Sequence, residues 1–312
     1  MAILKPGSLL SLQGDYPYQM KNQPKYRWWK PICVALLTLV LLTVFDLISY
    51  AVIYFLSGGD PQVTAALSPS TDGSYTGGDP TSPVTMLMSF IPLALMIPSA
   101  GISMRVFGLG GLGTLSSVEG KLRWKRFLSY VPLTFGVALV FNILTFAASA
   151  LTGGDWGEVT FVPLTLILII ILCPFQCAAE EYIFRGLTFQ TFASWIPVVV
   201  IPFIIQMIIF VLGHGYNVVG LAAVGFTGLC TGWLAIKTGG LEASITLHSV
   251  NNVLSFATSA LFISQTVKSD TTVEGLIFDL IYTLILTTVL YQIAKRKGYI
   301  EAQRTEVQPA EA

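Results

Sequence analysis

The sequence contains about eight apolar segments long enough to cross a bilayer as helices, each crossing needing roughly 20 residues. They lie near Pro31–Ser57, Thr85–Phe107, Phe127–Leu151, Val159–Arg185, Trp195–Leu212, Val218–Ile236, Leu241–Ile263 and Val273–Ala294. Only 11% of the 312 residues are charged and 54% are hydrophobic, whereas a soluble domain carries about a quarter charged residues. The sequence therefore predicts an all-α, polytopic membrane protein of about eight transmembrane helices.

Charged residues indicate how such a bundle is oriented in the membrane. Basic side chains cluster before the first span, between the second and third, and after the last: Lys5, Lys21, Lys25, Arg27 and Lys30; Lys121, Arg123, Lys125 and Arg126; Lys295, Arg296 and Lys297. The first loop, 58–84, holds three Asp and no Lys or Arg. By the positive-inside rule both termini are expected in the cytoplasm. The balance of 17 basic and 17 acidic residues argues against a nucleic-acid partner.

The four cysteines all fall within predicted spans, at Cys33, Cys173, Cys177 and Cys230. Cysteines in such surroundings behave as small packed side chains. We expect them to be free thiols rather than disulfides.

Ionisable residues inside the spans are few, and each costs several kcal/mol (about 3 on insertion scales) unless it is paired or hydrated, so each is a candidate for function. They are Asp46, Glu180, Glu181, Arg185, His214, His248 and Asp279. Asp46 and Asp279 are isolated along the sequence. The other five form the set from which a site can be built.

The two glutamates are adjacent in sequence and differ in their helical neighbours. Arg185 follows Glu181 by four residues, so these two can pair on one helix face. Glu180 then points elsewhere, with a like charge beside it, and is suited to act as a general base. A group of charges that merely ends a helix is the alternative interpretation of Glu181 and Arg185.

The chain has only two histidines, and both lie in or beside apolar spans. Asn252 follows His248 by four residues, which places both on one face of the seventh span, while Asn251 points away. An imidazole and a carboxamide in that arrangement can donate hydrogen bonds to a developing oxyanion.

These residues allow two mechanisms of peptide hydrolysis. In the first, Glu180 and His214 activate a water, and His248 and Asn252 stabilise the oxyanion. In the second, Glu180, His214 and His248 bind a metal, most simply zinc, whose water attacks. The sequence has neither the His-Glu-x-x-His helix of zinc proteases nor the Gly-x-Ser-x-Gly turn of serine hydrolases. We favour the mechanism without a metal or other cofactor.

Together the motifs Glu180-Glu181-x-x-x-Arg185, Phe210-x-x-x-His214 and His248-x-x-x-Asn252 resemble the CPBP family. That family includes the type 2 CAAX prenyl proteases and the bacteriocin-processing or immunity proteins, also called the Abi family. The resemblance implies an intramembrane endopeptidase of eight helices with a polar cavity open to the cytoplasmic side. It also implies prenylated CAAX-type proteins or leader peptides as substrates, and the plasma membrane as the location.

Carried over residue by residue, the resemblance makes Glu180 the water-activating base, assisted by His214. His248 and Asn252 form the oxyanion hole, Glu181 and Arg185 support Glu180, and Phe210 packs the cavity wall. We expect residues 1–30 to be a cytoplasmic arm and residues 31–294 the membrane domain, with a catalytic core at about 159–263. Residues 295–312 are expected to form a disordered cytoplasmic tail.

Two other functions remain open: a transporter, because intramembrane Glu and His also occur in proton-coupled carriers, and a non-catalytic immunity protein on the same fold. One geometric condition must also be met. In a straight fifth span, His214 would lie roughly 25 Å from the inner end of the span, whereas Glu180 would be only about 5–10 Å deep. Pro197 and Pro202 allow a kink or break, so we predict a displaced, tilted or broken fifth segment that brings His214 to Glu180.

Overall fold

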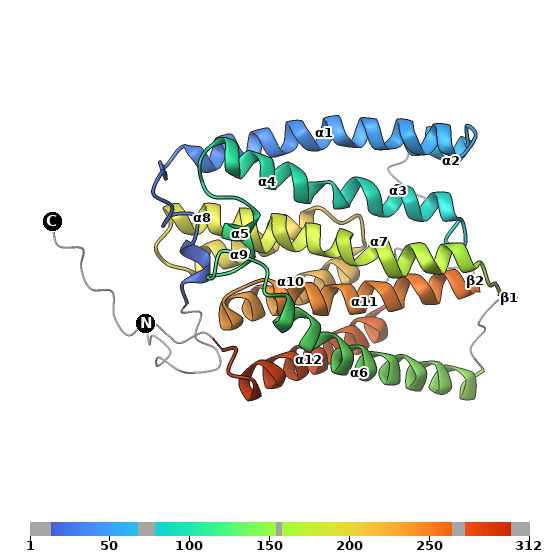
Figure 1. The fold of residues 1–312 in the computed structure, drawn as a ribbon. Coiled ribbons are helices and arrows are strands. Elements are labelled where there is room, and N and C mark those ends of the chain that lie inside the picture. Colours follow the sequence, from blue (N-terminus) through green and yellow to red (C-terminus); the bar gives the residue numbers. More distant parts are fainter. Residues whose placement is uncertain (1–13, 68–78, 154–157, 264–271, 301–312) are drawn as a thin grey trace.

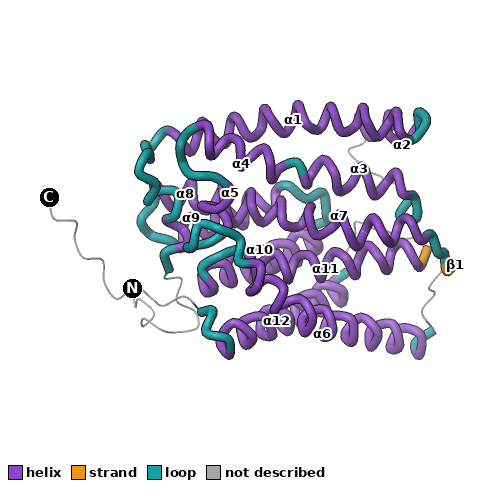
Figure 2. The backbone as a smooth tube through the Cα atoms, viewed as in Figure 1, coloured by secondary structure: helices purple, strands orange, loops and turns teal. Residues whose placement is uncertain are grey.

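All eight predicted spans are helical over most of their length in a computed structural model, which describes residues 14–67, 79–153, 158–263 and 272–300. The α-helices are α1 (Lys30–Leu56), α2 (Pro61–Leu67), α3 (Pro83–Ala94), α4 (Met96–Val106), α5 (Leu112–Ser116), α6 (Trp124–Leu151), α7 (Pro163–Glu181), α8 (Phe189–Trp195), α9 (Val200–Leu212), α10 (Val218–Thr238), α11 (Glu242–Leu261) and α12 (Val273–Arg296). They form an elongated bundle (Figures 1 and 2). The predicted all-α membrane fold is confirmed.

Four short elements complete the described chain. A 3-10 turn, η1 (Tyr16–Tyr18), precedes α1, and a π-helix, η2 (Tyr182–Thr188), joins α7 to α8. The strands β1 (Glu158–Val159) and β2 (Phe262–Ile263) pair antiparallel beside the first residues of α7 and the last residues of α11 (Figure 1). This pairing ties together the two helices that carry most of the predicted site.

Six helical segments of the described chain are long and apolar enough to cross a membrane. They include the continuous helix Pro163–Trp195, which joins α7, η2 and α8. The two predicted spans outside this set are α9, which has only 13 residues, and α11, which is less apolar. In α11 every residue from Glu242 to Val250 is buried, because the helix packs among α6, α7, α10 and α12. A helix enclosed by other helices need not be apolar all round, so α11 tolerates polar residues that a lipid-facing helix does not.

The outer helices show the opposite pattern. In the most apolar stretches of α1 and α6, only 17% and 11% of the residues are buried inside the protein, against 50% in α10. Their exposed side chains include Leu36, Leu47 and Ile143. Exposed apolar surface of this extent suits contact with lipid tails. α1 and α6 therefore form lipid-facing sides of the bundle.

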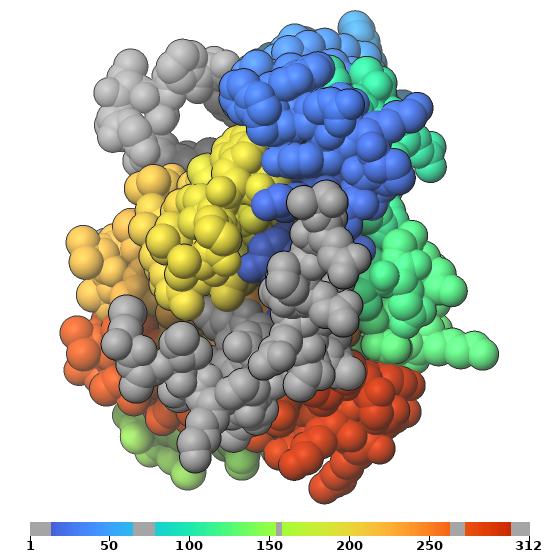
Figure 3. All heavy atoms as spheres, turned by 90° about the vertical axis from the view of Figure 1, so that its left-hand side faces the viewer, coloured from blue at the N-terminus to red at the C-terminus, as the bar shows by residue number. Residues whose placement is uncertain are grey.

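The first residues of α1 and α6 and the last residues of α12 lie at the same end of the bundle (Figure 1). The chain segment from residue 14 to residue 29, here called the N-terminal strap, folds across that end. The hydroxyl of Tyr16 donates to the Leu115 carbonyl at 2.6 Å, and that of Tyr26 donates to Ser194 Oγ at 3.1 Å. In a view onto this end, the blue N-terminal part lies between the yellow and green parts of the surface (Figure 3). The strap thus joins α5 to α8.

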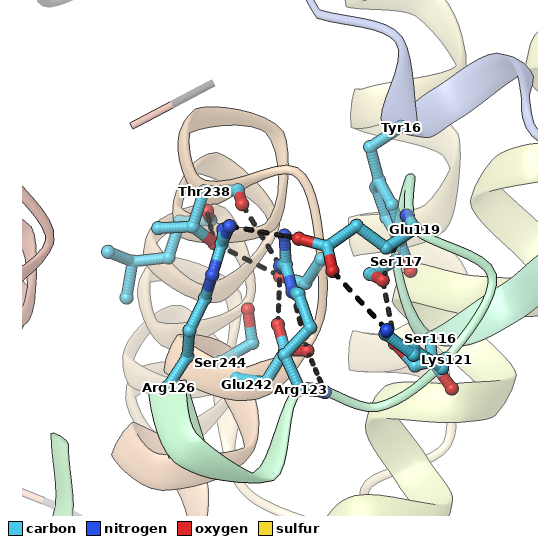
Figure 4. A network of polar contacts seen from close by, with 12 residues as sticks. Tyr16, Ser116, Ser117, Glu119, Lys121, Arg123, Arg126, Thr238, Glu242 and Ser244 are labelled. Carbon is cyan, nitrogen blue, oxygen red and sulfur yellow. Dashed lines mark hydrogen bonds and ion pairs between the residues drawn. The ribbon is translucent and has the colours of Figure 1, made fainter. Parts of the chain in front are cut away.

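An ion pair holds the α10–α11 turn against the segment that precedes α6 (Figure 4). Arg123 donates from Nε and Nη2 to the two carboxylate oxygens of Glu242, at 2.9 and 2.6 Å, and its backbone N–H donates to the same carboxylate at 2.8 Å. Nη2 also reaches the Thr238 carbonyl at 3.0 Å. Both side chains are buried. The charge pattern of the sequence indicated only an orienting role for Arg123, and no motif singled out Glu242.

All four cysteines are free thiols, as expected. In the described part of the chain, a pocket of about 250 Å³ lies between α1 and the bend from α3 to α4, and its lining is almost wholly apolar. It is not the polar cavity expected from the family resemblance, which stays a prediction.

Candidate functional site

Glu180 and Glu181 are the last two residues of α7, where the chain changes from an α-helix to the π-helix η2. Their exposed fractions are only 8% and 0%. π-turns are rare and occur often at functional sites, because the extra residue redirects the side chains that follow. Arg185, within η2, donates from Nη1 to Glu181 Oε1 at 3.0 Å, and both side chains are fully buried. The ion pair predicted from their spacing is present.

His248 of α11 lies between the two carboxylates. Its Nδ1 is 2.9 Å from Glu181 Oε1, and its Nε2 is 3.6 Å from Glu180 Oε2. Because a carboxylate only accepts hydrogen bonds, we assign the Nδ1 proton to the contact with Glu181. The separation of Nε2 and Glu180 exceeds a direct hydrogen bond. The imidazole is thereby oriented by one glutamate and presented to the other.

Phe210 of α9 connects the remaining predicted residues. The guanidinium carbon of Arg185 lies 4.0 Å from the centre of the Phe210 ring, a cation–π arrangement. The same ring contacts His214 edge-on at 4.7 Å and His248 at 6.2 Å between ring centres. Phe210 is buried. Its predicted place as a packing residue beside His214 agrees with these contacts.

His214 lies in the turn between α9 and α10, just beyond the short α9. Residues 196–199 are non-helical and connect α8 to α9, and α9 is continuous from Val200 to Leu212. The predicted displacement of the fifth segment that brings His214 to Glu180 stays a prediction. The His214 Nδ1 contacts the Phe210 carbonyl at 2.8 Å. In the described part of the chain no hydrogen bond joins His214 to Glu180, and the imidazole in contact with Glu180 is that of His248. The pairing of His214 with Glu180 therefore stays a prediction.

Asn252 lies one turn after His248 on α11 and is half-buried. The Asn251 side chain donates from Nδ2 to Asn252 Oδ1 at 3.0 Å. This bond occupies the carbonyl end of Asn252 and leaves its amide nitrogen as the end able to donate elsewhere. Asn251 had been expected to point away from the face of His248 and Asn252, but its amide group reaches that of Asn252.

The zinc alternative requires Glu180, His214 and His248 around one ion. Within the described ranges, no group of three or more His, Cys, Asp or Glu side chains has an arrangement that could hold a metal ion. Glu180, His214 and His248 therefore do not form such a group in the arrangement described, and the mechanism without a metal stays a prediction.

The contacts define an intramembrane polar cluster in which Glu180, Glu181, Arg185 and His248 are joined through Phe210 to His214. Residues 162–254 match the sequence model of the family described as "Type II CAAX prenyl endopeptidase Rce1-like". This segment includes all seven predicted site residues, and the match agrees with the resemblance to the CPBP family. No curated protein and no solved structure matches the chain.

Proposed function

We propose that this protein is an intramembrane endopeptidase that hydrolyses peptide bonds with a water activated by Glu180. The observation that supports this most directly is the position of His248, held by Glu181 through Nδ1 and facing Glu180 through Nε2. Two groups 3.6 Å apart are too distant to bond directly, yet one water beside them can hydrogen-bond to both. The family match supports the same reaction class.

In the proposed reaction, Glu180 accepts a proton from the water as its oxygen forms a bond to the peptide carbonyl carbon. The carbonyl electron pair moves onto its oxygen, giving a tetrahedral oxyanion. The oxyanion receives hydrogen bonds from the Asn252 amide and from His248 Nε2, in the form of the imidazole that carries protons on both nitrogens. The C–N bond then breaks, and Glu180 returns the proton to the leaving amine.

His214 is proposed to help hold the water. The His214 ring lies beside Phe210, and the same Phe210 ring also contacts His248, so both imidazoles pack against one aromatic side chain. Glu181 and Arg185 act through His248 rather than on the substrate. Because His248 contacts both glutamates, it lies nearer to the proposed base, Glu180, than the motif spacing alone had indicated.

The substrates that we propose are prenylated proteins ending in Cys-aliphatic-aliphatic-X, or leader peptides. The description of the matching family supports the first. We further propose that the protein lies in the plasma membrane with the basic end of the bundle and both termini in the cytoplasm. The shared end of α1, α6 and α12 supports this orientation, since it collects the basic clusters (Figure 1).

The test is a comparison of Glu180→Gln with wild-type protein. We expect cleavage of an internally quenched farnesylated Cys-aliphatic-aliphatic-X peptide to fall by at least about 100-fold, since general-base catalysis contributes that much or more. The matched control is Glu274→Gln, which makes the same change at an exposed residue of α12 and should leave cleavage unchanged. Proteomic comparison of membranes from cells with each variant extends the test to native substrates. Full cleavage by Glu180→Gln would exclude this mechanism, and absence of cleavage by the wild-type protein would leave a transporter or an immunity protein.

Metal dependence is tested separately on the wild-type protein. Incubation with a strong chelator should leave the rate of peptide cleavage unchanged. Strong inhibition that is reversed by added zinc would instead establish the zinc-dependent version of the reaction.

A further inference from the structure

Gln176 is a buried side chain one helical turn before Glu180 on α7, and no motif singled it out. Its exposed fraction is 5%. Its Nε2 donates to Glu180 Oε1, and its Oε1 accepts from the Cys177 thiol, with 3.3 Å between the heavy atoms. Residues four apart on a helix lie side by side, so this contact follows from the helical geometry of α7.

The contact makes the two oxygens of Glu180 unequal. Oε1 is occupied by the Gln176 amide, while Oε2 faces His248 Nε2 at 3.6 Å. A carboxylate can rotate about its last bond, and a hydrogen bond to one oxygen restricts that rotation. Gln176 therefore leaves Oε2 as the oxygen of Glu180 that faces His248.

The neighbouring glutamate has a different kind of donor. Glu181 is paired with the Arg185 guanidinium, a cation that compensates its charge, whereas Glu180 receives its bond from a neutral amide. A neutral donor orients a carboxylate without neutralising it, and hydrogen bonds to a charged donor are the stronger kind. The same helix end thus holds one compensated carboxylate and one whose charge stays available to accept a proton.

We propose that Gln176 is a positioning residue of the peptidase reaction, which fixes Glu180 with Oε2 toward the water. The inference rests on the proposed function of Glu180. It goes beyond it by assigning a role to a side chain that does not itself touch substrate. If the role were only structural, loss of the amide would lower stability without a specific effect on turnover.

The first test is Gln176→Met, which keeps the length of the side chain and removes its donor. With the quenched farnesylated peptide, we expect kcat to fall about tenfold or more with KM little changed, because misoriented catalytic groups lower turnover rather than binding. The matched control is Gln206→Met. Gln206 is buried as well, and among the described residues its amide donates to the Phe203 carbonyl at 3.0 Å. The control should lose comparable stability while keeping kcat.

A second measurement needs no substrate. Dicyclohexylcarbodiimide modifies carboxyl groups in their protonated form, and removal of a hydrogen-bond donor favours that form in an apolar site. Labelling of Glu180, quantified by mass spectrometry of the peptide that carries it, should increase in Gln176→Met and stay at the wild-type level in Gln206→Met.

The near-isosteric Gln176→Glu serves if the Met variant does not fold. When the introduced carboxyl group is protonated, it can again donate to Glu180, and when it is ionised it repels Glu180. The activity of this variant relative to wild type should therefore rise as the pH is lowered, which a purely structural role does not explain.

The outcomes separate this inference from the proposed function. Inactive Glu180→Gln together with wild-type kcat and wild-type labelling in Gln176→Met would overturn the role of Gln176 alone. A pH-independent activity ratio for Gln176→Glu would do the same. Fully active Glu180→Gln would overturn the proposed function, and the role of Gln176 with it.

Discussion

The buried charges of the site stabilise one another through shared atoms. Glu181 Oε1 accepts hydrogen bonds both from Arg185 Nη1 at 3.0 Å and from His248 Nδ1 at 2.9 Å. A single carboxylate oxygen therefore fixes a residue of η2 and a residue of α11. Because these groups are removed from water, each depends on its partner, and the loss of one leaves the other buried without compensation.

Substitution of Glu181 should show this dependence. Glu181→Gln leaves Arg185 buried without its counter-charge, and we expect a loss of about 3–5 kcal/mol in the free energy of unfolding. The double variant Glu181→Gln/Arg185→Met removes the unpaired charge, while the Gln carbonyl can still accept from His248, so most of the stability should return. Thermal unfolding in detergent micelles measures both. Equal stability of the single and double variants would contradict the idea that buried Arg185 depends on the charge of Glu181.

The pairing of α9 with α10 relies on glycines that allow close approach. A Cβ atom at Gly232 would lie 2.9 Å from the Phe203 ring and 3.0 Å from Gln206 Nε2. A Cβ atom at Gly228 would lie 3.1 Å from Arg185 Nη2 and 3.3 Å from the Phe210 ring. Small residues at helix contacts are the usual means of tight packing inside membranes. Here they also leave space for the cation–π contact between Arg185 and Phe210.

Gly232→Ala should therefore destabilise the bundle although alanine favours helices. Overpacking of this kind costs about 1–3 kcal/mol. The matched control is Gly136→Ala in α6, where an added Cβ atom meets nothing within 4 Å, so that variant should gain about 0.5–1 kcal/mol from helix propensity. Thermal unfolding of the two variants checks the prediction, and a stabilised Gly232→Ala would show that α9 and α10 are not this close.

Across the whole molecule, the N-terminal strap connects parts of the chain that are distant in sequence. Tyr16 is fully buried and bonds to the α5 carbonyl of Leu115, and the adjacent Ser116 Oγ lies 2.7 Å from the Tyr182 hydroxyl of η2. The strap, α5 and the π-helix after the two glutamates thus form one chain of contacts. The expected cytoplasmic arm is, over residues 14–29, a packed part of the fold, while residues 1–13 and 301–312 of the expected arm and tail lie outside the described residues.

Tyr16 gives this chain of contacts a pH dependence. Burial, and next the nearby Tyr182, raise the pKa of Tyr16 well above its ordinary value. A raised pKa in the folded state means that the stabilisation is complete below the unfolded value of about 10 and is lost as pH rises through the folded value. At pH 8 the free energy of unfolding of Tyr16→Phe should be about 1 kcal/mol lower than that of wild type. Above pH 10 it should fall less steeply with pH than the free energy of unfolding of wild type. Unfolding measured across this range tests it, with Tyr18→Phe, whose exposed hydroxyl bonds to Pro197 at 3.3 Å, as the milder control. Parallel pH curves for wild type and Tyr16→Phe would contradict it.

The residue pattern was sufficient to predict the helices, and it named the candidate site residues, whose roles stay predictions. Long apolar segments form helices in a bilayer because the backbone must satisfy its own hydrogen bonds there, and segment length and hydropathy show where. The Glu181–Arg185 pair followed from helical spacing. The free-energy cost of charges inside a membrane marked Glu180, His214 and His248 before any geometry was known.

Contacts between helices could not be predicted in the same way. Nothing in the local pattern indicated that His248 lies between the two glutamates, that Arg123 pairs with Glu242, or that Tyr16 is buried. Each of these contacts joins residues far apart along the chain. Their formation depends on how α7, α9 and α11 pack and on where the π-turn rotates the chain. Periodicity describes which face of a helix is polar, whereas only the packed bundle decides which partner that face meets.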